Sequence, residues 1–97
     1  MSALNGKQRR ALRALGHSLK PVVQVGQEDL SEGVVAAVDE QLEAHELIKI
    51  KVGQGAQSSR HEAGEVLAQR TQSELVQVLG RTLLLYRRHP EKPKIEI

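Results

Sequence analysis

The 97-residue sequence contains no cysteine, tryptophan or phenylalanine, and Tyr86 is its only aromatic residue. Without cysteine, neither a disulfide nor a thiolate metal site can form, which is consistent with a reducing cytosol. The hydrophobic core must therefore consist of aliphatic side chains. A chain with one aromatic residue also cannot stack several bases, as aromatic-rich RNA-binding sheets do.

The sequence also lacks a long apolar run. No stretch approaches the roughly 18 apolar residues of a membrane span, and the basic N-terminus has no apolar signal-peptide centre or cleavage site. We therefore expect a cytoplasmic protein that does not contact the membrane. The length predicts a single domain over residues 1–88. Two prolines in the last nine residues indicate an extended, flexible tail over residues 89–97.

The net charge is only +2, from 14 lysines and arginines and 12 acidic residues, but the charges are segregated. Residues 7–20 carry basic side chains without an acid, whereas residues 28–46 carry acids without a lysine or arginine. Charge separated in this way is typical of a molecule whose basic face meets a polyanion. Solvated helix faces that simply differ in charge would give the same pattern, so composition leaves both interpretations open.

Apolar periodicity predicts helices over residues 5–18, 31–45 and 59–71 and strands over residues 21–25, 47–52, 74–79 and 82–87. In the first helix, Leu15 belongs to the apolar stripe, and the arginines at 9, 10 and 13 are expected to face solvent. Ser31 and Ser59 are suited to cap the second and third helices.

This α-β-α-β-α-β-β order predicts an α/β fold, a two-layer sandwich with a four-stranded mixed sheet. The βαβ units favour parallel pairing with right-handed crossovers, and the final hairpin adds antiparallel pairing. A doubly wound nucleotide-binding domain is excluded because there are too few strands and no G-x-G-x-x-G or phosphate-binding loop.

No constellation of residues indicates catalysis. His45-Glu46 and His61-Glu62 are the only histidine–acid neighbours, and neither is followed by a second histidine at helical spacing. Adjacent residues on a helix point about 100° apart and do not form one site. We therefore expect no catalytic residue, no metal, no cofactor and no small-molecule substrate.

The basic residues are the strongest functional candidates. Arg9, Arg10 and Arg13 would present guanidinium groups suited to phosphate contact, and binding through several such residues is salt-sensitive. The protein would then read backbone shape and 2′-hydroxyl groups, with at most one base on Tyr86. The alternative is a protein-interaction adaptor in which the acids of the second helix bind a basic partner.

Several motifs occur in a characteristic order: Leu19-Lys20-Pro21-Val22-Val23, Gly26, Leu30-Ser31-Glu32-Gly33-Val34, His45-Glu46-Leu47-Ile48-Lys49-Ile50-Lys51 and Gly80-Arg81-Thr82-Leu83-Leu84-Leu85-Tyr86-Arg87. Together they resemble the YhbY family, the stand-alone bacterial form of the CRM domain (chloroplast RNA splicing and ribosome maturation). The resemblance spans about residues 4–88 and rests on the whole series of motifs.

The resemblance implies a fold related to the C-terminal domain of translation initiation factor three and an RNA-binding function. Bacterial members are associated with precursors of the large (50S) ribosomal subunit, and plant relatives act in group II intron splicing. We therefore expect a monomeric, non-catalytic protein that docks on structured rRNA during ribosome assembly. A general accessory factor in translation or intron splicing is the alternative within the same partner class.

In this family, RNA binding is attributed to a basic surface and a glycine-containing loop. Together with the basic residues above, the resemblance gives these expected RNA contacts: Arg9, Arg10, Arg13, Lys20, Gly26, Gly33, Lys49, Lys51, Gly80, Arg81, Thr82, Tyr86, Arg87 and Arg88. Asp29 departs from the family pattern, because members usually carry a glycine there. An acid at this position would weaken phosphate contact at its loop.

Overall fold

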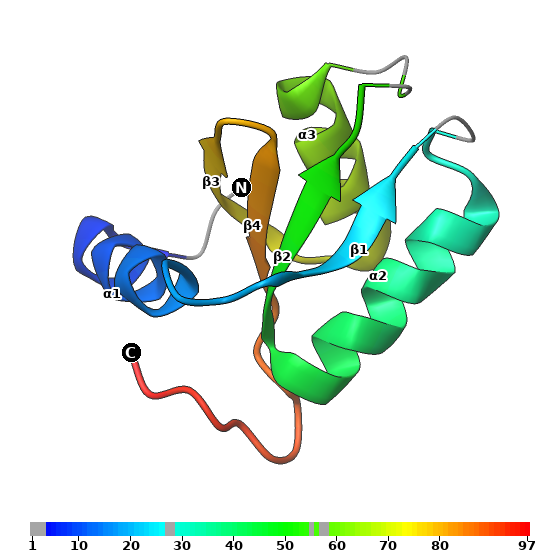
Figure 1. The fold of residues 1–97 in the computed structure, drawn as a ribbon. Coiled ribbons are helices and arrows are strands. Elements are labelled where there is room, and N and C mark those ends of the chain that lie inside the picture. The colour runs from blue at the N-terminus through cyan, green and yellow to red at the C-terminus, as the bar shows by residue number, and fades with distance from the viewer. Residues whose placement is uncertain (1–3, 27–28, 55, 57–58) are drawn as a thin grey trace.

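A computed structural model describes residues 4–26, 29–54, 56 and 59–97. The elements, drawn in Figure 1, are α1 (Gly6–Gly16), β1 (Pro21–Val25), α2 (Glu32–His45), β2 (Leu47–Val52), α3 (Arg60–Thr71), β3 (Glu74–Leu79) and β4 (Thr82–Tyr86). The expected α/β order is confirmed. Ser31 and Ser59 cap α2 and α3 as predicted, and each hydroxyl accepts a backbone N–H from the first turn. None of the helices in these ranges is long and apolar enough to cross a bilayer.

The four strands form one mixed sheet in the order β1-β2-β4-β3. β1 pairs with β2 in parallel, and β4 pairs antiparallel with both β2 and β3. The last strand of the chain therefore lies in the interior of the sheet, and β1 and β3 form its edges.

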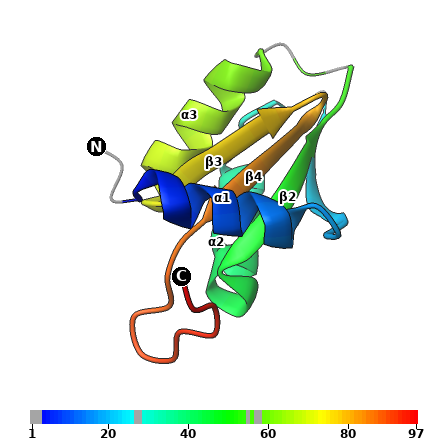
Figure 2. The ribbon, with the colours of Figure 1, turned by 90° about the vertical axis from the view of Figure 1, so that its left-hand side faces the viewer.

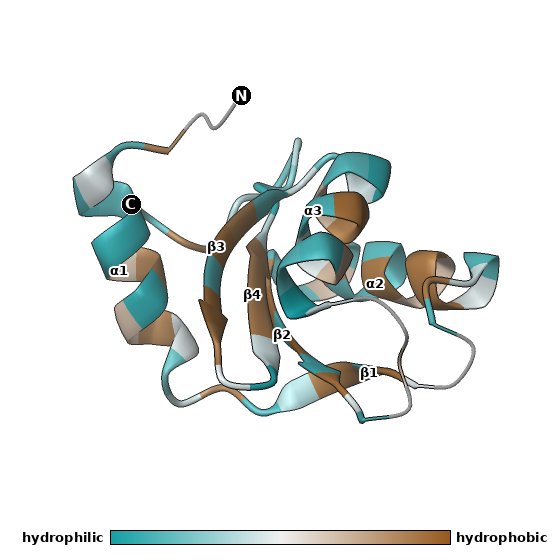
Figure 3. Ribbon diagram, turned by 90° about the horizontal axis from the view of Figure 1, so that it is seen from above, coloured by the Kyte–Doolittle hydropathy of each residue, from teal (hydrophilic) through white to brown (hydrophobic). Residues whose placement is uncertain are grey.

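Helices cover both faces of this sheet. α2 and α3 pack on one face over a cluster that includes Ile50, Leu83 and Leu85. α1 crosses the other face (Figure 2), where Leu12 packs with Leu84 and Tyr86. Figure 3 shows the largely hydrophobic strands β3 and β4 between α1 and the other two helices. The structure has three layers, α1, the sheet, and α2 with α3, where the sequence predicted two. The third layer is needed because β4 buries side chains on both faces of the sheet.

α1 lies close to the sheet at two points. A Cβ atom on Gly16 would lie 2.7 Å from both methyl groups of Leu84, so a larger residue here would force the buried Leu84 side chain or the helix to shift. At the other end of the helix, the Arg9 guanidinium donates to the carbonyl oxygens of Leu75 (3.0 Å) and Val76 (3.5 Å) on β3. The expectation that Leu15 lies in the buried stripe is wrong, since its side chain is 47% exposed.

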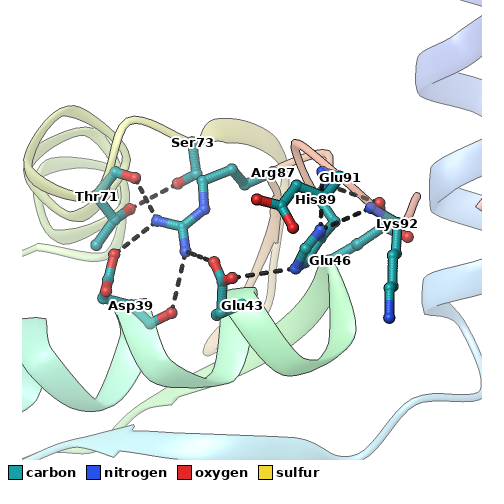
Figure 4. A network of polar contacts seen from close by, with 9 residues as sticks. All are labelled: Asp39, Glu43, Glu46, Thr71, Ser73, Arg87, His89, Glu91 and Lys92. Carbon is teal, nitrogen blue, oxygen red and sulfur yellow. Dashed lines mark hydrogen bonds and ion pairs between the residues drawn. The ribbon is translucent and has the colours of Figure 1, made fainter. Parts of the chain in front are cut away.

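The C-terminal tail is held by the buried side chain of Glu46, the residue that follows α2 (Figure 4). Its carboxylate accepts backbone N–H groups of His89 (2.8 Å), Lys94 (2.6 Å) and Ile95 (2.9 Å). Burial alone would raise the pKa of Glu46, but these donors and nearby His89 outweigh it and lower the pKa. The tail contains no helix or strand, and it folds back so that Ile95 packs against the core beneath α1.

We expect Gly16→Ala to lower the free energy of unfolding by about 1–3 kcal/mol, because overpacking a filled core forces side chains from their rotamers. At an open helical position the same change would stabilise by roughly 0.5–1 kcal/mol. Gly6→Ala is the matched control in the same helix, where the nearest atom, Arg10 Nη1, would lie 3.6 Å from the new Cβ. Urea denaturation measures both, and a Gly16→Ala protein as stable as the wild type would contradict the close packing.

We expect Glu46→Gln to destabilise the protein by about 1.5–3 kcal/mol at neutral pH, the contribution of hydrogen bonds to a charged group. Because the folded pKa of Glu46 lies below its ordinary value of 4.5, its stabilisation is complete above that value and is lost as the pH falls through the folded pKa. The stability difference between wild type and variant should therefore shrink as the pH falls below 4.5. Glu40→Gln, at an exposed position of α2, is the control. A stability difference between wild type and Glu46→Gln that does not change with pH would refute the role of the Glu46 charge in holding the tail.

Candidate nucleic-acid interface

α1 covers only part of its face of the sheet. The half nearer the β3–β4 turn carries side chains that α1 leaves accessible: Gln24, Lys49, Lys51, Gln77, Leu79 and Thr82. Lys49 and Lys51 alternate with Ile48, Ile50 and Val52, which point into the core under α2 and α3. The strand periodicity therefore brings two lysines to the open half of the α1 face.

Lys49 and Lys51 lie in this open half, Lys20 lies beside Lys49, Arg81 lies at the end of β2, and α1 carries two exposed arginines. Arg13 lies one helical turn after Arg9, which contacts β3, and therefore on the same flank of α1. The set comprises Arg10, Arg13, Lys20, Lys49, Lys51 and Arg81, and we call it the basic surface; Lys49 is half-buried and the others are exposed.

The glycine-containing turns lie at one end of this surface. Val25 is in register with Val52, and the Val52 N–H donates to the carbonyl oxygen of Arg81 (2.7 Å). Gly26, which follows Val25, and the β3–β4 turn are therefore at the same end of the sheet, as Figure 1 shows. Gly80 adopts a positive φ of 59° in that turn, a conformation that favours glycine.

The turn also has contacts that the sequence did not indicate. The Thr82 hydroxyl donates to the carbonyl oxygen of Leu79 (2.7 Å) and closes the turn. The Arg60 guanidinium, from the first residue of α3, donates to the carbonyl oxygen of Gly80 (2.7 Å). Arg60 thus adds an exposed cation beside Arg81. Arg60 and Gly80 are 20 positions apart in the sequence, and no local signal indicates this contact.

The structure gives a physical reason for the glycine that the family usually carries where this chain has Asp29. Its φ is 54°, in the left-handed region that glycine adopts without a steric cost. Aspartate is among the side chains that tolerate this region, and the Asp29 N–H donates to the carbonyl oxygen of Gly26 (2.9 Å). Asp29 therefore occupies a backbone conformation that a glycine would adopt without steric cost.

Two of the expected RNA contacts are engaged inside the protein. Arg9, expected to face solvent, is bound to the β3 carbonyls. Tyr86 is 5% exposed and packs beneath α1, so it offers no face for a base to stack on. Burial and the nearby Glu46 carboxylate raise the pKa of Tyr86, while Arg88 opposes them, and the phenol is neutral at physiological pH.

The Arg87 side chain lies between α2 and the end of α3, the two helices on the sheet face opposite to α1 (Figure 4). Its guanidinium donates to the Asp39 carboxylate (2.6 Å), to the carbonyl oxygen of Thr71 (2.8 Å) and to Glu43 (3.5 Å). The side chain is 20% exposed and links the end of β4 to α2 and α3. Arg87 does not belong to the candidate interface, because both terminal nitrogens of its guanidinium already have partners within the protein.

The remaining two expected residues lie away from the basic surface. Gly33 is exposed in the first turn of α2. Arg88 is exposed just after β4, at the end of the strand opposite to the β3–β4 turn, and borders a hollow between α1 and the tail. Neither residue is brought to Arg13 or Lys51 by the strand register.

The two helical faces of the molecule differ in charge. α1 carries Arg10 and Arg13, whereas α2 carries the acidic residues Asp39, Glu40 and Glu43 on the other side of the sheet. Asp39 and Glu43 are paired with Arg87, and Glu43 also contacts His89 (3.0 Å). In the part of the chain that the structure describes, no group of His, Asp and Glu side chains could hold a metal ion.

A model of the CRS1/YhbY (CRM) domain matches residues 4–87, nearly the range over which the sequence shows its resemblance. The probable RNA-binding protein YqeI of Bacillus subtilis is 38% identical over 94 residues, which cover 97% of this chain and 98% of that protein. An RNA-binding protein of Haemophilus influenzae is 37% identical over 97 residues and covers 100% and 97% of the two chains.

A solved structure is similar over the whole fold. The Staphylococcus aureus protein SAV1595, proposed to bind RNA, is 40% identical to this chain, with a TM-score of 0.82. The similarity covers 97% of this chain and 98% of that one. The relatives named here are described as RNA-binding proteins and not as enzymes.

Proposed function

This chain belongs to the CRS1/YhbY (CRM) domain family, and from this premise we propose that it binds structured RNA through the basic surface. The observation that supports the proposal is that Lys51 of β2 lies exposed on the sheet face that α1 only partly covers, with exposed Arg81 on the turn at its end and exposed Arg13 on α1. Relatives that are 37–40% identical are named for RNA binding.

The arrangement suits recognition of the RNA backbone. Guanidinium groups bind phosphate oxygens in a bidentate manner, and a surface with several cations releases several counterions when RNA binds. Tyr86 is buried and no other aromatic residue exists, so base stacking on a ring does not contribute. Double-stranded or structured RNA is read largely through phosphates and 2′-hydroxyl groups.

We further propose that the RNA is rRNA of large-subunit precursors, the partner that the family resemblance implies. In this role the protein is a cytoplasmic monomer that works without a cofactor or a small-molecule substrate, and it stabilises a conformation of the RNA during assembly. The acids of α2 are less suited to an adaptor role, because Asp39 and Glu43 already bind Arg87 and His89 within the chain.

We expect Arg13→Gln to weaken binding to a paired RNA hairpin and to reduce the slope of log K against log salt by about 1, the loss of one phosphate contact. Arg70→Gln is the matched control. Arg70 is exposed on α3, so this substitution removes the same charge from the other face of the sheet. Fluorescence anisotropy at several salt concentrations gives both slopes. Equal effects of the two substitutions would show that only total charge matters and would contradict the basic surface.

In a bacterial lysate separated on a sucrose gradient, we expect the protein to migrate with large-subunit precursors at low salt. Ribonuclease, moderate salt and the combined Arg10→Gln, Arg13→Gln and Arg81→Gln substitutions should each move it to the top, because each removes electrostatic contact with RNA. Protein that remains at the top under every condition, although folded and able to bind an RNA hairpin, would refute the ribosomal assignment alone.

A further inference from the structure

A groove with several apolar side chains lies beside the basic surface, and the proposed phosphate contacts do not involve these side chains. It has a volume of about 570 Å³ and lies between the end of α1, the start of β1 and β2; its lining includes Leu15, Leu19, Lys20, Val22, Lys49 and Ile95. The volume falls in the range of roughly 300–1,000 Å³ that small-molecule sites occupy. The groove is therefore large enough for a nucleotide.

The groove is apolar although it is open to solvent. Leu15 is 47% exposed and Val22 is 46% exposed, and both are among the few large apolar side chains in the described part of the chain with this much exposure. The β1–β2 register shifts between Pro21 and Val23, so Val22 has no partner residue on β2, as the extra residue of a bulge would. Bulges re-aim side chains, here toward the groove.

Two lysines border the same groove, Lys20 from the α1–β1 connection and Lys49 from β2. Both also belong to the basic surface, so the groove continues it without a break. An apolar floor between two ammonium groups is complementary to a flat base whose flanking phosphates are anionic. Ser18 and His45 add hydrogen-bonding groups for the edge of a base.

We propose that this groove binds one unpaired nucleotide of the RNA, with the base against Leu15 and Val22 and the neighbouring phosphates on Lys20 and Lys49. The inference rests on the proposed RNA-binding function and adds a preference for structured RNA that carries a bulged nucleotide. It supplies the base contact that the buried Tyr86 does not provide.

The test compares two RNA hairpins that differ only in one bulged adenosine, by fluorescence anisotropy. The wild-type protein should bind the bulged hairpin about tenfold more tightly, or about 1.4 kcal/mol. The double variant Leu15→Gln and Val22→Thr should lose this preference while it binds the paired hairpin as the wild type does. Both side chains are exposed, and thermal melting checks that the variant is folded.

Leu79→Gln is the matched control. Leu79 is 61% exposed and lies on β3, at the opposite edge of the sheet from Val22. This substitution removes an exposed leucine outside the groove and should leave the tenfold ratio unchanged. A loss of the ratio in this control as well would overturn the assignment of the base to the groove.

The failure of this inference is distinguishable from the failure of the proposed function. Binding of neither hairpin would overturn both, whereas equal binding of the two hairpins by the wild type would overturn only the nucleotide site. Methyl NMR of Leu15 and Val22 adds a second readout, with shifts expected on addition of the bulged hairpin alone. Shifts caused only by an acidic, leucine-containing peptide would assign the groove to a protein partner and overturn the proposal.

Discussion

The packing of α1 against the sheet is the contact on which the rest of the molecule depends. Gly16 allows the helix to approach Leu84, and Arg9 binds the β3 carbonyls at the other end. Together they close a second core, with Leu12 and Tyr86, on the face that α2 and α3 do not cover. Because α1 covers only part of that face, its position also determines which lysines of β2 are accessible. One docking contact thus shapes both the hydrophobic core and the candidate interface.

Most of the fold could be predicted from local patterns. Alternation in β2 and serine caps before α2 and α3 are short-range signals, and the elements they predict are present. The third layer was not predicted, because helical periodicity shows that α1 has an apolar side but not which face of the sheet receives it. The run from Leu83 to Tyr86 could have predicted this layer, because four consecutive buried residues in one strand require other elements to cover both faces of the sheet.

The candidate site was predictable in composition but not in detail. Arg10, Arg13, Lys51 and Arg81 are exposed as expected. Arg87 and Arg9 could not be separated from them by sequence, because their partners, Asp39 and the β3 carbonyls, are far away in the chain. The hydrogen bonds by which Glu46 holds the C-terminal tail were not predicted for the same reason. Its carboxylate binds backbone N–H groups more than forty residues later, and any residue type except proline can provide such a donor.

The division of charge between the two helical sides connects this structure to its proposed function. Acids on α2 have a structural partner in Arg87, whereas the basic surface on the α1 side is directed to solvent. The measurement that tests this most directly is a ¹H–¹⁵N NMR titration of the protein with a structured RNA hairpin. The account predicts perturbed amides at Arg13, Lys51 and Arg81 and unperturbed amides along α2. Perturbations concentrated on α2 and α3, with α1 and the β3–β4 turn unaffected, would contradict it.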